Sequence, residues 1–128
     1  MRKTTYLFVL LLGFIMFGCG PDTIFLRPGL DTPSVHVANG NNLLERGKVD
    51  DAYREFQRAK VLDPSYTPAY IGLGIVLGQK GRIDDGLKTL DMASEMADND
   101  KDRAAVEQGY LRLHELKRNQ DETQKPNS

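Results

Sequence analysis

The sequence predicts an all-α protein, a short α-solenoid of two helix-turn-helix units followed by a C-terminal capping helix. Internal repetition is the first observation, because residues 33–66 align with residues 67–100 at a period of 34 residues, with six identical pairs. The second is that glycines divide both copies at the same points. The third is an apolar N-terminal run, ending in the only cysteine, that precedes the repeats. Repeats of this length are typical of stacked helical units that cannot bury their apolar faces alone.

The N-terminal segment, residues 1–18, has the organisation of an export signal. Arg2 and Lys3 are basic, Tyr6–Phe17 carries no charge, and small residues follow from Gly18. This order of charged, apolar and small residues is that of a signal peptide. The apolar stretch is shorter than the ~20 residues that a bilayer crossing needs. A retained transmembrane anchor is therefore the second interpretation.

Cys19 stands where this signal ends. A single cysteine cannot form an internal disulfide, the usual role of cysteine in an exported protein. Residues 16–19, Met-Phe-Gly-Cys, resemble a bacterial lipobox, although Phe17 is bulkier than the usual residue there. The resemblance implies lipidation of Cys19: diacylglycerol on its sulfur, cleavage before it, and acylation of the new amine by a fatty acid such as palmitate. Several acyl chains give a stable anchor. A buried or incidental thiol is the alternative.

The residues after Cys19 bear on localisation and on the tether. Gly20 takes the place of the acidic residue that holds lipoproteins in the inner membrane. By resemblance to that sorting rule, the sequence implies the periplasmic face of the outer membrane in a double-membraned bacterium. Residues 19–32 are expected to form a tether. Its apolar triplet Ile24–Leu26 either packs on the first helix or stays exposed.

The first repeat, residues 33–66, is expected to contain helices over Pro33–Glu45 and Asp50–Leu62. Thr32 is the expected N-cap, with proline at the first helical position. Gly47 is expected to end the first helix in a left-handed conformation, which a side chain would resist. Pro64 ends the second.

The second repeat, residues 67–100, is expected to follow the same plan. Thr67 would cap a helix over Pro68–Gln79, Gly81 would end it, and Asp84–Ala97 would form the second helix.

The remainder of the chain is expected to close the solenoid. A fifth helix over residues 101–119, capped by Asn99 or Asp100, forms the capping helix. Residues 120–128 are polar and contain Pro126, so they are expected to be a disordered tail.

This layout resembles the tetratricopeptide repeat (TPR) family. The resemblance covers residues 33–100 and rests on small and large residues at matching places: Gly40 and Gly74, Gly47 and Gly81, Ala52 and Gly86, Phe56 and Leu90, Ala59 and Ala93. Departures from the family pattern are His36 at a position for a large residue, Asn39 for leucine, and Asp98 for the second proline. The resemblance implies a concave face, lined by the first helix of each repeat, that binds a protein partner.

Correspondence with the family assigns residues to this partner groove: Val37, Asn41, Leu44, Ile71, Ile75 and Gly78, extended by Ala105 and Arg112. In the TPR domains that clamp a carboxylate, lysines stand where this chain has Val37 and Ile71. An apolar groove, with Gly78 leaving room, instead suits an amphipathic helix or an extended apolar segment. Alternatively, Val37, Ile71 and Ile75 simply pack between neighbouring helices.

No catalytic site, metal site or cofactor is predicted. His36 and His114 lie on different predicted helices, and the Asp50-Asp51 and Asp84-Asp85 pairs stand at helix starts, where capping explains them. Basic and acidic residues, 17 and 18, are nearly balanced. No electrostatic pattern therefore points to nucleic acid.

Together these features predict a membrane-anchored TPR lipoprotein that scaffolds or escorts an envelope protein, not an enzyme. Pilotins, which carry secretin subunits to the outer membrane, are lipoproteins of similar architecture. The alternatives are an adaptor for envelope or peptidoglycan maintenance and, from another class, a small hydrolase subunit. Homo-oligomerisation stays open.

Overall fold

The computed structural model describes residues 31–124, and within that range it is helical with no strand, as the sequence predicts. The five helices are α2 (Pro33–Glu45), α3 (Val49–Leu62), α4 (Thr67–Gln79), α5 (Ile83–Met96) and α6 (Asp100–Thr123). The export signal, the lipidation of Cys19 and the packing of Ile24–Leu26 lie outside the described residues.

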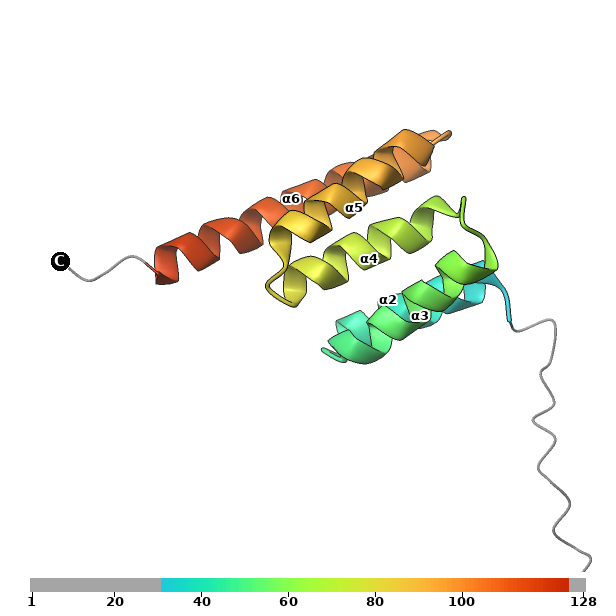
Figure 1. The fold of residues 1–128 in the computed structure, drawn as a ribbon, viewed down its shortest axis with the longest axis horizontal. Coiled ribbons are helices and arrows are strands. Elements are labelled where there is room, and N and C mark those ends of the chain that lie inside the picture. Colours follow the sequence, from blue (N-terminus) through green and yellow to red (C-terminus); the bar gives the residue numbers. More distant parts are fainter. Residues whose placement is uncertain (1–30, 125–128) are drawn as a thin grey trace, which may run out of the picture.

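The helices form two antiparallel hairpins, α2 with α3 and α4 with α5, and α6 lies along the second hairpin (Figure 1). α4 contacts each of the other four helices, whereas α2 and α6 make no contact with each other. This arrangement is the predicted stack of two helix-turn-helix units with a capping helix.

Both hairpin turns depend on a glycine in the left-handed region. Gly47 has a φ of 72° and Gly81 a φ of 80°, where a residue with a Cβ is strained. The turns have the same hydrogen bonds: Lys48 N–H donates to the Leu43 carbonyl and Arg82 N–H donates to the Leu77 carbonyl. The prediction that these glycines end the first helices is confirmed.

The helix caps agree with the sequence for α2 and α6 and differ for α4, while α3 and α5 each begin one residue before the expected Asp50 and Asp84. Val35 N–H donates to Thr32 Oγ1, and Asp102 N–H donates to Asn99 Oδ1, so Thr32 and Asn99 are N-caps. Thr67 was the wrong choice, because Tyr66 is the N-cap of α4 and Thr67 lies inside the helix, 4% exposed. The Asp63 side chain accepts hydrogen bonds from Ser65, which closes the preceding turn. The chain thus enters the helix before Thr67.

α6 is longer than predicted. It continues past residue 119 to Thr123, so residues 120–123 belong to the helix and not to a disordered tail. No glycine or proline lies between residue 119 and Pro126, and the Thr123 hydroxyl donates to the carbonyls of Asn119 and Gln120. These bonds add to the backbone bonds of the last turn, where the Gln120 carbonyl also accepts from the Gln124 N–H.

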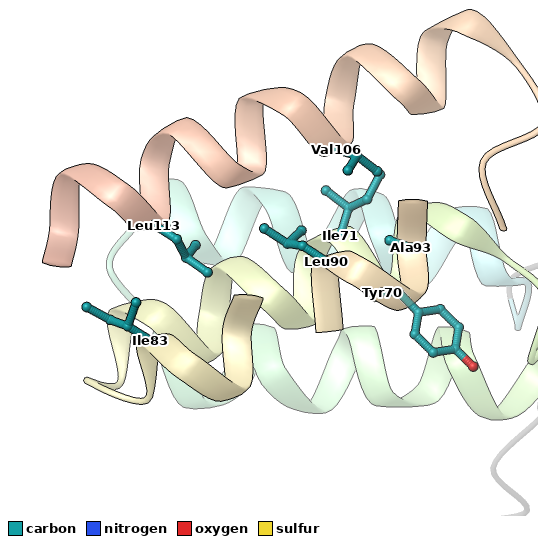
Figure 2. Close-up of a cluster of buried hydrophobic side chains, with 7 residues drawn as sticks. All are labelled: Tyr70, Ile71, Ile83, Leu90, Ala93, Val106 and Leu113. Carbon is teal, nitrogen blue, oxygen red and sulfur yellow. The ribbon is translucent and has the colours of Figure 1, made fainter. Parts of the chain in front are cut away.

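Two hydrophobic clusters form the interior. One joins α4, α5 and α6, and Figure 2 shows its side chains, Tyr70, Ile71, Ile83, Leu90, Ala93, Val106 and Leu113. The other joins α2, α3 and α4 and contains Ala52, Phe56, Leu73 and Val76. α4 supplies residues to both clusters. Its sequence is apolar on every side, as expected of a helix surrounded by others.

Glycines allow α4 to approach its neighbours closely. A Cβ on Gly74 would lie 2.9 Å from Leu90 Cγ and 3.0 Å from the Gly86 carbonyl oxygen, which confirms the predicted close contact. The expectation that Gly78 leaves room in the groove is wrong. Its Cβ would lie 2.9 Å from Leu113 Cγ, because α6 covers it. Gly78 is a packing position.

A candidate partner groove between α2, α4 and α6

A groove of about 440 Å³ runs along the face formed by the first helix of each repeat and α6. α4 forms its floor, and α2 and α6, which do not touch each other, form its walls. The residues lining it are Val37, Asn41, Tyr66, Pro68, Ile71, Gly72, Ile75, Lys101, Asp102, Ala105 and Gln108.

The floor of the groove is the exposed edge of the hydrophobic interior. Ile71 is 8% exposed and belongs to the cluster between α4, α5 and α6, on which the half-buried Ile75 and Ala105 also pack. Val37 packs on the other cluster. These side chains therefore pack between helices, and their free edges form an apolar surface.

The walls of the groove are polar. Asn41 on α2 and Gln108 on α6 are exposed, and each amide can donate and accept hydrogen bonds. Lys101 and Asp102 lie where α6 begins. Asp102 already accepts hydrogen bonds from Asn99 Nδ2 and supplies its own N–H to the Asn99 cap.

The structure brings together some of the residues that the sequence assigned to the groove and separates others. Val37, Asn41, Ile71, Ile75 and Ala105 line one groove. Leu44, Gly78 and Arg112 do not line it. Leu44 packs on the cluster between α2, α3 and α4, and Arg112 is exposed on α6.

Sequence reasoning missed six of the lining residues: Tyr66, Gly72, Pro68, Lys101, Asp102 and Gln108. A signal existed for one of these, because Asp102 is one 34-residue period beyond Pro68, just as Ala105 is one period beyond Ile71. Tyr66 precedes its helix, and Gln108 is one period beyond Gly74, which does not line the groove, so neither follows from correspondence.

A second hollow, of about 580 Å³, lies beside the last turns of α6. Its lining residues, His114, Lys117, Arg118, Asp121 and Glu122, all come from that one helix. A single helix cannot enclose a ligand, so this hollow is open surface.

One aspartate of each pair reaches a neighbouring helix in the stack. The N-caps of α3 and α5 are Lys48 and Arg82, without a side-chain cap bond, which corrects the expectation that the aspartates cap these helices. Asp50 instead pairs with Lys80 at the end of α4, and Asp84 lies 3.6 Å from Lys117 on α6. The hydrogen bond from Lys80 lowers the pKa of Asp50. These carboxylates link one repeat to the next element.

The described residues contain no group of three histidine, cysteine or acidic side chains that could hold a metal ion. Among the helices from α2 to α6, none is both long and apolar enough to cross a membrane.

Stacked helical hairpins with a groove along their first helices define a helical-repeat protein. Within that class, the tetratricopeptide repeat family model matches residues 43–108, just over half of the chain, and the chain therefore belongs to the TPR family. No curated protein and no solved structure matches it significantly. TPR domains bind protein partners and are typically non-catalytic interaction modules. The family thus supports the role of a protein–protein interaction scaffold.

Proposed function

We propose that this chain is a membrane-anchored TPR lipoprotein that holds an apolar segment of an envelope protein in its groove, as a scaffold or assembly escort. The anchor is the lipidated Cys19, at the periplasmic face of the outer membrane. By analogy of architecture with pilotins, the partner is a component of a secretion or pilus-type system.

The observation that carries this proposal is the apolar floor of the groove between polar walls. Val37 and Ile75 are half-buried, so part of each apolar side chain stays open to a partner. The lysine positions of a carboxylate clamp are occupied by Val37 and Ile71. Burial of a partner's apolar side chain there would contribute a favourable free energy of about 25 cal/mol per Å² of apolar surface buried.

A charge placed in the groove tests this function. Ala105 lines the groove from α6, and Ala104, its exposed neighbour on the same helix, does not. Ala105→Arg should place a charged side chain over the apolar floor. It should weaken capture of the partner from envelope extracts tenfold or more, and a tenfold loss of affinity corresponds to about 1.4 kcal/mol of binding free energy. Ala104→Arg adds the same charge outside the groove and should leave capture unchanged.

The two variants are compared on the full chain, with helicity measured by circular dichroism. A partner retained by the parent and by Ala104→Arg but lost by Ala105→Arg supports the groove. Equal capture by all three folded proteins would exclude it.

A further inference from the structure

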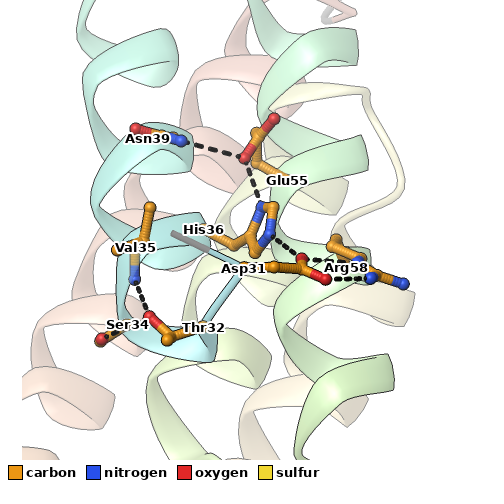
Figure 3. A network of polar contacts seen from close by, with 8 residues as sticks. All are labelled: Asp31, Thr32, Ser34, Val35, His36, Asn39, Glu55 and Arg58. Carbon is orange, nitrogen blue, oxygen red and sulfur yellow. Dashed lines mark hydrogen bonds and ion pairs between the residues drawn. The ribbon is translucent and has the colours of Figure 1, made fainter. Parts of the chain in front are cut away.

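His36 lies between two carboxylates that come from different segments. Its Nε2 is 2.9 Å from Asp31 Oδ1, in the chain that enters α2, and its Nδ1 is 2.8 Å from Glu55 Oε2 on α3 (Figure 3). The side chain is 17% exposed. Both ring nitrogens are therefore committed to acceptors.

This geometry suits only the charged form of the ring. A neutral imidazole has one N–H, and its other nitrogen is an acceptor. With a neutral His36, one carboxylate would face a lone pair instead of a proton. The imidazolium donates to Asp31 and Glu55 together.

The neighbouring groups complete the charge balance. Arg58 on α3 pairs with Asp31, with its Nε at 3.1 Å from Oδ1, and the Asn39 amide donates to Glu55 at 3.4 Å. α4, the other helix packed on α2, has Tyr70 as its sole titratable side chain, and that hydroxyl donates to the Pro64 carbonyl. The two cations offset the two carboxylates while His36 is protonated.

The pKa shifts agree with this balance. Burial is the largest single influence on His36 and opposes its charge, but the hydrogen bonds to Asp31 and Glu55 together raise its pKa above 6.5. Hydrogen bonds from Arg58 and then His36 lower the pKa of Asp31 to about 2. The raised pKa of His36 means that its stabilisation is complete below 6.5 and is lost as the pH rises through the folded-state pKa.

We propose that His36 is a pH-sensitive latch that holds the chain entering the repeats, at Asp31, against α3 while the ring is protonated. Loss of the proton removes one of the two carboxylate contacts and leaves the cluster with a net negative charge. Asp31 leads directly into α2 through the Thr32 cap. The latch thus sets how firmly the start of the repeat domain is attached.

NMR titration of the full chain in detergent tests the latch over about pH 5 to 9, where histidine changes charge. The imidazole signals of both histidines and the amide signals of Asp31 and Thr32 are followed together. We expect His36 to titrate above 6.5 and the two amides to shift with the same midpoint. His114 is the internal control, because it is exposed on α6, a helix that does not contact α2.

Two variants separate a latch from a merely structural histidine. Glu55→Gln removes one carboxylate and should lower the His36 midpoint. His36→Gln should abolish the pH-dependent shift of the Asp31 and Thr32 amides. The proposal is overturned by a His36 midpoint at or below 6.5, by a midpoint insensitive to Glu55→Gln, or by amides that do not follow His36. The parent titration decides even where a variant fails to fold.

Discussion

At the scale of a single residue, Cys19 provides the sulfur to which the proposed lipid anchor would be attached. Cys19→Ser keeps the size of the side chain but replaces the sulfur that would carry diacylglycerol. We expect the variant to accumulate as an unprocessed or soluble protein and to lose incorporation of labelled palmitate in a bacterial host. A protein that partitions into detergent without acyl chains would need another membrane segment.

The control for this experiment is Ala104→Arg, which leaves the signal untouched and should incorporate label as the parent does. Palmitate incorporated into Cys19→Ser at the parental level would contradict the lipidation proposal.

Two glycines on α4, Gly74 and Gly78, lie at close helix contacts that should differ in how well they accept an added methyl group. A methyl group on Gly74 meets Leu90 and the backbone carbonyl of Gly86, which cannot move aside. A methyl group on Gly78 meets only side chains of Leu113 and Leu116. Gly74→Ala should therefore cost about 1–3 kcal/mol of the free energy of unfolding. Gly78→Ala should cost less, since alanine is favoured over glycine in a helix by about 0.5–1 kcal/mol.

Denaturant unfolding followed by circular dichroism gives both values. Equal losses for the two substitutions would mean that the Gly86 carbonyl yields as easily as a leucine side chain.

At the scale of an element, α6 is part of the hydrophobic interior and not only a cover. Leu113 on α6 is fully buried against α4 and α5, while Leu111, two residues before it, is 56% exposed. Leu113→Ala should lower the free energy of unfolding by about 2–5 kcal/mol, because it leaves a cavity. Leu111→Ala removes the same atoms from the surface and should stay within about 0.5 kcal/mol of the parent.

Thermal and denaturant melts of the full chain measure the difference. If Leu113→Ala melts like Leu111→Ala, α6 does not seal the interior as described.

At the scale of the whole molecule, folding and the proposed partner binding share one helix. α4 lies between the two hydrophobic clusters and also forms the floor of the groove. Because Ile71 is held by the interior, the groove is formed before a partner arrives. A preformed surface loses little conformational entropy on binding, which favours affinity.

The sequence by itself determined the features that depend on local chemistry or on the repeat period. Gly47 and Gly81 must end helices because of their backbone freedom, Thr32 caps α2 by its own hydroxyl, and Gly74 follows from its match with Gly40. The period also placed Val37 and Ile71 on one face, since equivalent residues of stacked repeats line the same side.

Only the tertiary structure decided the features that depend on how α6 and the chain before α2 are placed. α6 begins 33 residues after α4, one fewer than the spacing from α2 to α4, although Ala105 still lines the groove one 34-residue period beyond Ile71. The packing of α6 against α4 covers Gly78 with Leu113 and places Gln108 in the groove wall. His36 contacts Asp31 and Glu55 because the chain before α2 and the helix α3 both pack against it. The repeat pattern of the sequence does not predict these contacts.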